Sequence, residues 1–216
     1  MQRDLSNYRR SYEKKELLES NVAADPIDQF EEWFREVALN YPDIEANALT
    51  LSTIGTDGYP KGRVVLLKMF SNEGFVFYTN YDSEKGLAIA ENPNVCLSFF
   101  WHEAERQVII KGKAAKVDIA ESDAYFTSRP KGSQLGALVS PQSQVIPGRE
   151  FLEAKLGELE KRYEAVSEVP RPENWGGYLV VPVEIEFWQG RANRLHDRIR
   201  FKRDGSDKWK MERLAP

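Results

Sequence analysis

Two strands joined by a turn are predicted for the segment Glu184–Lys202, and this pattern constrains the fold more than any other stretch of the chain. The segment opens with strand-like alternation, since apolar Ile185 and Phe187 are separated by acidic residues. Gly190 then marks a turn, and a second strand-like run follows over Arg194–Lys202. Such a segment favours a fold built on paired strands.

The second run contains an unusual grouping of charge. Arg194, His196 and Arg198 fall at every second position, so on a regular strand their side chains share one face. An imidazole between two guanidinium groups is unfavourable unless an anion lies between them. The alternative is a solvated edge strand with spaced charges, and the spacing alone leaves both interpretations open.

The rest of the chain predicts a mostly antiparallel β-barrel with peripheral helices, an α+β fold. Strands are expected over 48–54, 63–70, 75–80, 95–101, 106–111, 175–183 and 209–214, the first three as a meander, with a last turn at 204–207. Helices are expected from Asp25-Pro26 to about residue 41, and over 83–90, 118–128 and 148–165, whereas 135–139 is only a short apolar run.

No repeat or linker divides residues 25–216, which are therefore expected to form a single domain. Residues 1–24 are polar, and we expect them to be mobile unless something holds them. They are either a plain charged tail or a lid directed at a phosphate.

Composition excludes several classes of function. The net charge of −4 gives no general attraction to nucleic acid or to an anionic membrane, so an anion site must come from local clustering of cations. A single cysteine, Cys96, excludes an intramolecular disulfide and a cysteine-based metal cluster. His102 and His196 are too few and too far apart for a histidine-based metal motif, so no metal is expected. The charged amino-terminal sequence and the absence of a long apolar run predict a cytoplasmic protein.

Five separated motifs resemble one known enzyme family. They are RVVLLK at 63–68, FYTN at 77–80, ERQV at 105–108, YFTSRPKGSQLGALVSPQS at 125–143 and FWQGRANRLHDR at 187–198. Their order and content are similar to pyridoxine (pyridoxamine) 5′-phosphate oxidase, in register over nearly the whole chain. The resemblance implies a flavin mononucleotide (FMN)-binding split β-barrel that works as a homodimer with two sites at the interface. It also implies oxidation of a phosphorylated pyridine, pyridoxine or pyridoxamine 5′-phosphate, to pyridoxal 5′-phosphate, with dioxygen reduced to hydrogen peroxide.

The resemblance also implies the residues of the site. FMN would be held by Arg63, Val64, Val65, Leu66, Leu67, Lys68, Tyr78, Thr79, Lys85, Gln107, Gln142, Ser143, Trp188 and Arg198. Substrate would be held by Arg9, Arg10, Ser11, Tyr12, Lys68, Tyr125, Arg129, Ser133, Arg194, Leu195 and His196. Of these, Arg194 is expected to orient the substrate and stabilise charge, and His196 to form a hydrogen bond, as the catalytic pair.

Two details depend on local geometry. Arg63 and Lys68 are five positions apart, so a regular strand would put them on opposite faces, and binding one ligand with both needs a bend or a shared interface. Ser83 is a predicted helix cap, and Lys85 just after it would complete a phosphate cradle at the helix amino terminus. Glu84 departs from the Ser-Arg-Lys pattern of many relatives, and its charge would repel a phosphate.

Other functions remain open at this point. A non-catalytic protein that binds flavin or pyridoxal phosphate would keep the phosphate contacts without turnover. A flavin reductase with a nicotinamide donor would use the same fold. A barrel that binds single-stranded nucleic acid through aromatic and cationic side chains is a third alternative, although the basic balance expected for it is missing.

The departure at position 84 gives a first prediction. Replacing Glu84 with Arg should tighten FMN binding, because the change removes an anion beside the phosphate and adds a cation. The dissociation constant of FMN for the apoprotein measures the effect. An unchanged or weaker affinity would contradict the interpretation of Glu84 as an unfavourable neighbour.

Overall fold

The computed structural model describes residues 3–8, 10–166, 168–204 and 208–216. Two compact units can be distinguished. The first unit combines Met1–Thr50, Cys96–Lys111 and Pro182–Pro216, and the second combines Leu51–Val95 with Gly112–Val181. The prediction that residues 25–216 form one domain stays a prediction.

Hydrogen-bonded strands form one sheet among the described residues. The strands are β1 (Ala48–Ile54), β2 (Pro60–Leu66), β3 (Met69–Ser71), β4 (Gly74–Asn80), β5 (Asn94–Trp101), β6 (Arg106–Lys116), β7 (Trp175–Gln189), β8 (Asp197–Arg203) and β9 (Trp209–Arg213). Their order is β2-β1-β5-β6-β7-β4-β3, with β8 paired to β7 and β9 paired to β8. The pairs β3–β4, β4–β7, β7–β8 and β8–β9 are antiparallel, as expected.

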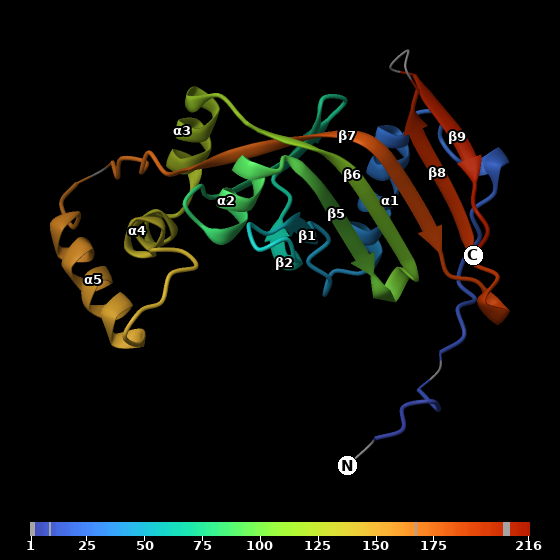
Figure 1. Ribbon diagram of the computed structural model, residues 1–216, viewed down its shortest axis with the longest axis horizontal. Coiled ribbons are helices and arrows are strands. Elements are labelled where there is room, and N and C mark those ends of the chain that lie inside the picture. Colours follow the sequence, from blue (N-terminus) through green and yellow to red (C-terminus); the bar gives the residue numbers. More distant parts are fainter. Residues whose placement is uncertain (1–2, 9, 167, 205–207) are drawn as a thin grey trace. The chain divides into compact units, whose positions relative to one another are not determined.

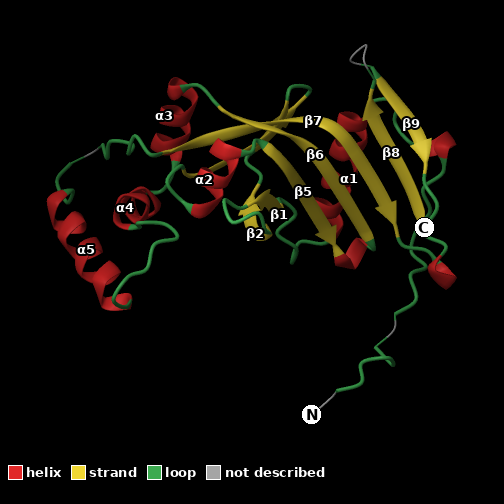
Figure 2. Ribbon diagram, in the orientation of Figure 1, coloured by secondary structure: helices red, strands yellow, loops and turns green. Residues whose placement is uncertain are grey.

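The helices are coloured red in Figure 2, and two of them, α1 and α2, begin at a side-chain cap. They are α1 (Pro26–Asn40), α2 (Glu84–Glu91), α3 (Ile119–Ser128), α4 (Lys131–Val139) and α5 (Arg149–Arg162). At α1 the predicted cap is confirmed, because the Asp25 carboxylate accepts from the backbone N–H of Ile27 at 2.7 Å. None of the helices in the described ranges has the length and apolar character that a membrane crossing requires.

Helix α1 supplies the core of the first unit. Its Phe30 ring lies 5.1 Å from the Phe99 ring of β5, and its Trp33 ring lies 5.3 Å from the Phe187 ring of β7. These four side chains are almost completely buried. Burial of a large aromatic side chain contributes about 1.5–3 kcal/mol, so both ring contacts stabilise the attachment of α1 to the sheet.

A separate core fills the second unit. Phe126 of α3, Leu135 of α4, Val169 and Trp175 of β7 form a buried cluster there. Helix α5 packs beside α4 (Figure 1) and lends its partly buried apolar residues to the same cluster. The end of β7 that carries Trp175 is thereby fixed against α3 and α4.

The predicted meander of three strands is wrong. The segment 63–70 is two strands, because β2 ends at Leu66 and β3 begins at Met69. In the sheet order β2 lies at one end beside β1, while β3 lies at the other end beside β4. The strand is therefore interrupted at residues 67 and 68, between Arg63 and Lys68.

One further element differs from prediction, and another is not tested. The run 135–139 belongs to helix α4, which Gly132 and Gly136 conceal in the sequence. The Gln134 side chain holds α4 to the end of α3 by donating to the carbonyls of Phe126, Thr127 and Arg129 at 3.0–3.1 Å. The predicted turn at 204–207 lies largely outside the described residues, although β8 and β9 do pair.

Glycine at position 86 gives a prediction on stability. A methyl group added to Gly86 would collide with the backbone carbonyl of Tyr81, which cannot move without disturbing the start of α2. Gly86→Ala should lower the free energy of unfolding by about 1–3 kcal/mol, measured by urea denaturation.

The matched control is Gly157→Ala in α5. There an added methyl meets no atom of the described residues within 4 Å, and alanine favours a helix by up to about 1 kcal/mol over glycine. Equal stability changes in the two variants would contradict the steric argument.

Candidate active site

A cavity of about 480 Å³ in the second unit gathers most of the residues predicted there. It is lined by Val64, Val65, Leu66, Lys68, Tyr78, Thr79, Lys85, Tyr125, Arg129, Pro130, Ser133, Gln142 and Trp175. Strands β2, β4 and β7 and helices α2, α3 and α4 contribute to this wall. The lining residues include three cations, Lys68, Lys85 and Arg129, and no carboxylate.

Lys85 is the most buried of these cations. It is 9% exposed, and its Nζ donates to Gln142 Oε1 at 2.9 Å and contacts Ser83 Oγ at 3.3 Å. Gln142 Oε1 also accepts from the Thr79 hydroxyl at 3.1 Å. Burial and then the nearby Arg63 charge lower the pKa of Lys85 to about 8. A buried ammonium with neutral partners would be stabilised by an anion.

A second group of lining residues combines aromatic rings with Arg129. The rings of Tyr78 and Tyr125 stack with centroids 3.8 Å apart, and the Trp175 ring lies parallel to both. The Arg129 guanidinium lies over Trp175, 4.6 Å from the ring centroid. Its Nη1 atom is buried and has no hydrogen-bond partner among the described residues. An unsatisfied buried donor is unfavourable, so this group also fits an anion such as phosphate.

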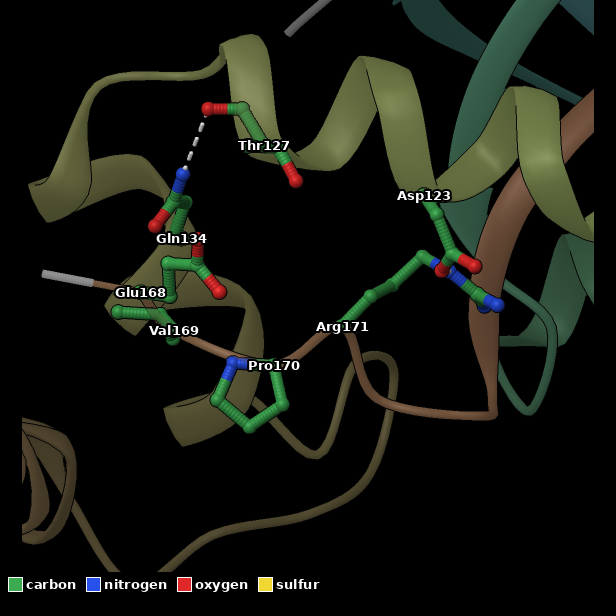
Figure 3. A pocket seen from close by; sticks show the side chains of 7 residues that line it. All are labelled: Asp123, Thr127, Gln134, Glu168, Val169, Pro170 and Arg171. Atoms are coloured by element: carbon green, nitrogen blue, oxygen red, sulfur yellow. Dashed lines mark hydrogen bonds and ion pairs between the residues drawn. The ribbon is translucent and has the colours of Figure 1, made fainter.

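A second cavity of about 530 Å³ has a different chemistry (Figure 3). Its lining includes the carboxylates of Asp123 and Glu168. Its cation, Arg171, is already paired with Asp123 at 2.6 Å and donates to two backbone carbonyls. This cavity therefore suits an anion far less than the first one, and its lining contains no residue of the predicted site.

In the first unit, the predicted strand face of Arg194, His196 and Arg198 is wrong. Strand β8 begins only at Asp197, and Arg194 belongs to a short 3-10 turn, Ala192–Arg194. Asn193 and Arg194 both adopt left-handed backbone conformations, with φ of 57° and 62°. Such positions are strained by about 1–3 kcal/mol in non-glycine residues and are enriched at functional sites. Sequence alternation could not reveal them.

His196 is held by the same turn. Its Nδ1 accepts from the backbone N–H of Arg191 at 3.1 Å, so the neutral ring carries its proton on Nε2. The ring also contacts the Trp188 ring at 4.8 Å and the Tyr12 ring at 5.8 Å. Gly190 permits this packing, because a side chain there would collide with Tyr12. Tyr12, Trp188 and His196 are thus brought together as predicted site residues.

Contacts hold the amino-terminal segment 10–17 to the first unit. The buried Glu105 carboxylate accepts from the backbone N–H groups of Glu13 and Lys14 at 2.9 and 3.0 Å. Asp197 accepts from the Leu17 N–H at 3.0 Å and pairs with Arg191 at 3.0 Å. The carboxylate of Asp197 therefore joins this segment to the turn that carries His196.

The other predicted residues have varied surroundings. Arg198 donates to Glu186 at 2.7 Å and to the Ala215 carbonyl at 2.9 Å, while Leu67 is buried and does not line the cavity. Arg63 donates to the Thr53 hydroxyl at 2.6 Å. Gln107 is half-buried on β6, whereas Ser143, with φ of 71°, and Leu195 are exposed. In the amino-terminal segment, Arg10 contacts His102 at 3.1 Å and the Ser11 hydroxyl donates to Glu13. Arg9 lies outside the described residues.

Sequence reasoning missed two contributors. Trp175 was expected only as a strand residue, although the glycines at 176 and 177 after it indicated close approach of another element. Lys61 was not singled out, yet its Nζ binds both carboxylate oxygens of Glu84 at 2.6 and 2.7 Å. No local pattern connects these two residues, which are far apart in the sequence.

Comparisons with known proteins cover nearly the whole chain. Residues 34–163 match the family model for pyridoxamine 5′-phosphate oxidase, and residues 175–216 match that for the pyridoxine 5′-phosphate oxidase C-terminal dimerisation region. The pyridoxine/pyridoxamine 5′-phosphate oxidase of Flavobacterium johnsoniae is 64% identical over 212 residues, which cover 98% of this chain and 99% of that protein. That of Leptospira interrogans serovar copenhageni is 50% identical, covering 98% of each.

Solved structures show the same fold. PhzG from Burkholderia lata, in complex with tetrahydrophenazine-1-carboxylic acid, matches with a TM-score of 0.84 at 31% identity, covering 91% of this chain and 95% of that one. A pyridoxamine 5′-phosphate oxidase-related, FMN binding protein from Nostoc punctiforme matches with a TM-score of 0.69 at 16% identity, over 90% of this chain and all of that one, which bears on the fold alone.

The chain carries the family's dimerisation region at its carboxyl end, so its expected assembly is a homodimer. Both family models match in order, and the curated relatives align along almost the full length of the chain. The chain therefore belongs to the pyridoxine/pyridoxamine 5′-phosphate oxidase family, with its FMN-dependent chemistry and split-barrel fold.

Proposed function

We propose that this protein oxidises pyridoxine 5′-phosphate or pyridoxamine 5′-phosphate to pyridoxal 5′-phosphate, with dioxygen as the electron acceptor. The observation that carries the proposal is the cavity of the second unit, where buried Lys85 and the unsatisfied Arg129 face a space without carboxylates. Cofactor and substrate of this reaction are both phosphate esters, so the site must hold two phosphates. The family membership supplies the identity of the two ligands.

The residues present fit FMN. Lys85 with Arg63 would hold its phosphate, because burial lowers the pKa of both cations and the Arg63 charge lowers that of Lys85 further. Gln142 and Thr79 would complete the polar contacts on that side. When bound, FMN supplies a two-electron oxidant that dioxygen regenerates, with hydrogen peroxide as the by-product.

The substrate phosphate would be held by the group of lining residues around Arg129. Arg129 offers the free Nη1, Lys68 adds a positive charge, and the hydroxyl groups of Tyr125 and Ser133 can donate hydrogen bonds. The aromatic rings of Tyr78 and Trp175 keep Tyr125 and Arg129 in place. These contacts orient the pyridine ring without taking part in bond changes.

Arg194 and His196 are proposed to act on the pyridine ring in the homodimer, at sites at the subunit interface. Both residues lie within the matched dimerisation region. His196 would donate a hydrogen bond from Nε2, since its Nδ1 is occupied by the Arg191 N–H. Arg194 would orient the substrate and stabilise charge on it during the reaction.

An aerobic assay tests the proposal. The purified, FMN-loaded protein is given pyridoxine 5′-phosphate, and pyridoxal 5′-phosphate and hydrogen peroxide are measured together. We expect the two products in equal amounts. A flavin-bound protein that forms neither product would shift the function to a reductase or a binding role.

The role of Arg194 gives a prediction. Arg194→Ala should lower kcat/KM by roughly 10²-fold or more, the usual effect of losing a group that stabilises the transition state. FMN content, measured by absorbance after gel filtration, should change little. Arg198→Ala serves as the comparison and should lower the FMN content, because Arg198 is proposed to contact the flavin. An equal loss of activity and FMN content in Arg194→Ala would contradict the assignment.

Lys85 gives a prediction on pH. Its folded-state pKa of about 8 lies below the ordinary value, so the free protein loses this positive charge as the pH rises through 8. The dissociation constant of FMN should therefore be lowest below pH 8 and rise by up to about tenfold per pH unit between 8 and 9.5. Lys85→Met should bind FMN more weakly and with no such rise. A wild-type affinity that is constant from pH 7 to 9.5 would refute the role of Lys85.

A further inference from the structure

An ion pair lies beside the predicted phosphate cradle. Glu84 is the first residue of α2 and directly precedes Lys85, and its carboxylate is bound through both oxygens by Nζ of Lys61 on β2. Both partners are about half exposed. An exposed pair of this kind contributes only about 0–1 kcal/mol to stability, so stability alone gives little reason for it.

The charge of Glu84 affects the neighbouring cations more than it affects stability. The Glu84 charge raises the pKa of both Arg63 and Lys85, against the effect of burial, so it acts on both cations proposed to hold the FMN phosphate. A carboxylate at this place would also repel a bound phosphate. It is otherwise favourable, because an acidic residue stabilises the first turn of a helix. The site thus contains an anion that helps α2 and opposes the ligand.

We propose that Lys61 is a determinant of FMN binding, because its ammonium group neutralises Glu84 and so preserves the positive potential around Arg63 and Lys85. Lys61 has no part in the site inferred from the family resemblance. The inference rests on the proposed function, since it concerns the phosphate of FMN. Lys61 acts indirectly, by neutralising Glu84. Arg63 and Lys85 are the residues proposed to contact the FMN phosphate.

A double-mutant cycle tests the proposal. The dissociation constant of FMN is measured for the apoprotein by quenching of flavin fluorescence at low salt. Lys61→Gln should raise it about three- to tenfold, the effect expected for one solvent-screened charge near an anion. In the Glu84→Gln background, the same change should have less than a twofold effect. Lys161→Gln on α5 alters the net charge equally and should leave the dissociation constant unchanged.

Two further readouts isolate the phosphate. Riboflavin lacks the 5′-phosphate, so Lys61→Gln should not alter its dissociation constant. Added salt should diminish the effect on FMN, because screening weakens interactions between exposed charges. Equal weakening of FMN binding in both backgrounds would mean that Lys61 acts on the ligand independently of Glu84 and would overturn the proposal. No weakening in either background, or equal weakening for riboflavin, would overturn it as well.

These results are distinct from a failure of the proposed function. Wild-type protein that takes up no FMN would defeat the oxidase assignment itself. Wild-type protein that binds FMN and turns over substrate, together with an unaffected Lys61→Gln variant, would defeat only the role of Lys61.

Discussion

The long strand β7 is the constraint on which both units depend. Its first half pairs with β4, from Trp175 opposite Asn80 to Val180 opposite Phe75, and its second half pairs with β8. Trp175 at its start belongs to the cavity of the second unit, and Trp188 near its end contacts His196 in the first. Because side chains alternate along a strand, a register shift of one residue would turn these side chains to the other face.

Within the second unit, the packing of side chains buries positively charged groups, which is unfavourable without an anion. The packing around Trp175, Tyr78 and Tyr125 partly buries Arg129, whose Nη1 has no partner among the described residues, and burial likewise weakens the charged state of Lys85. Folding thus creates groups whose energetic cost a phosphate can offset. For the same reason, the Glu84 carboxylate beside these cations opposes the binding of a phosphate. Lys61, which pairs with Glu84, is therefore proposed to affect FMN binding more than it affects stability.

In the first unit, the unfavourable feature is backbone strain at one turn. Two successive left-handed residues, Asn193 and Arg194, lie between strands β7 and β8, and hydrogen bonds from both flanks hold them. Asp197 at the start of β8 then binds Arg191 and the Leu17 backbone, so the turn and the amino-terminal segment support one another. A turn held in this way can present a guanidinium and an imidazole with little loss of side-chain freedom on binding.

Local signals in the sequence determined much of this protein. Strand β1 has its predicted bounds, the caps at Asp25 and Ser83 are present, and the quoted motifs, through the family resemblance, pointed to most of the residues that line the cavity. These features depend on neighbours in the chain, so a short window contains their cause. Only the tertiary structure decided the break between β2 and β3, the helix α4 and the left-handed turn at Arg194. It also decided the pairing of Lys61 with Glu84. In each of these cases the stabilising partner is distant in sequence or the backbone state is locally unfavourable, so only the assembled fold could select it.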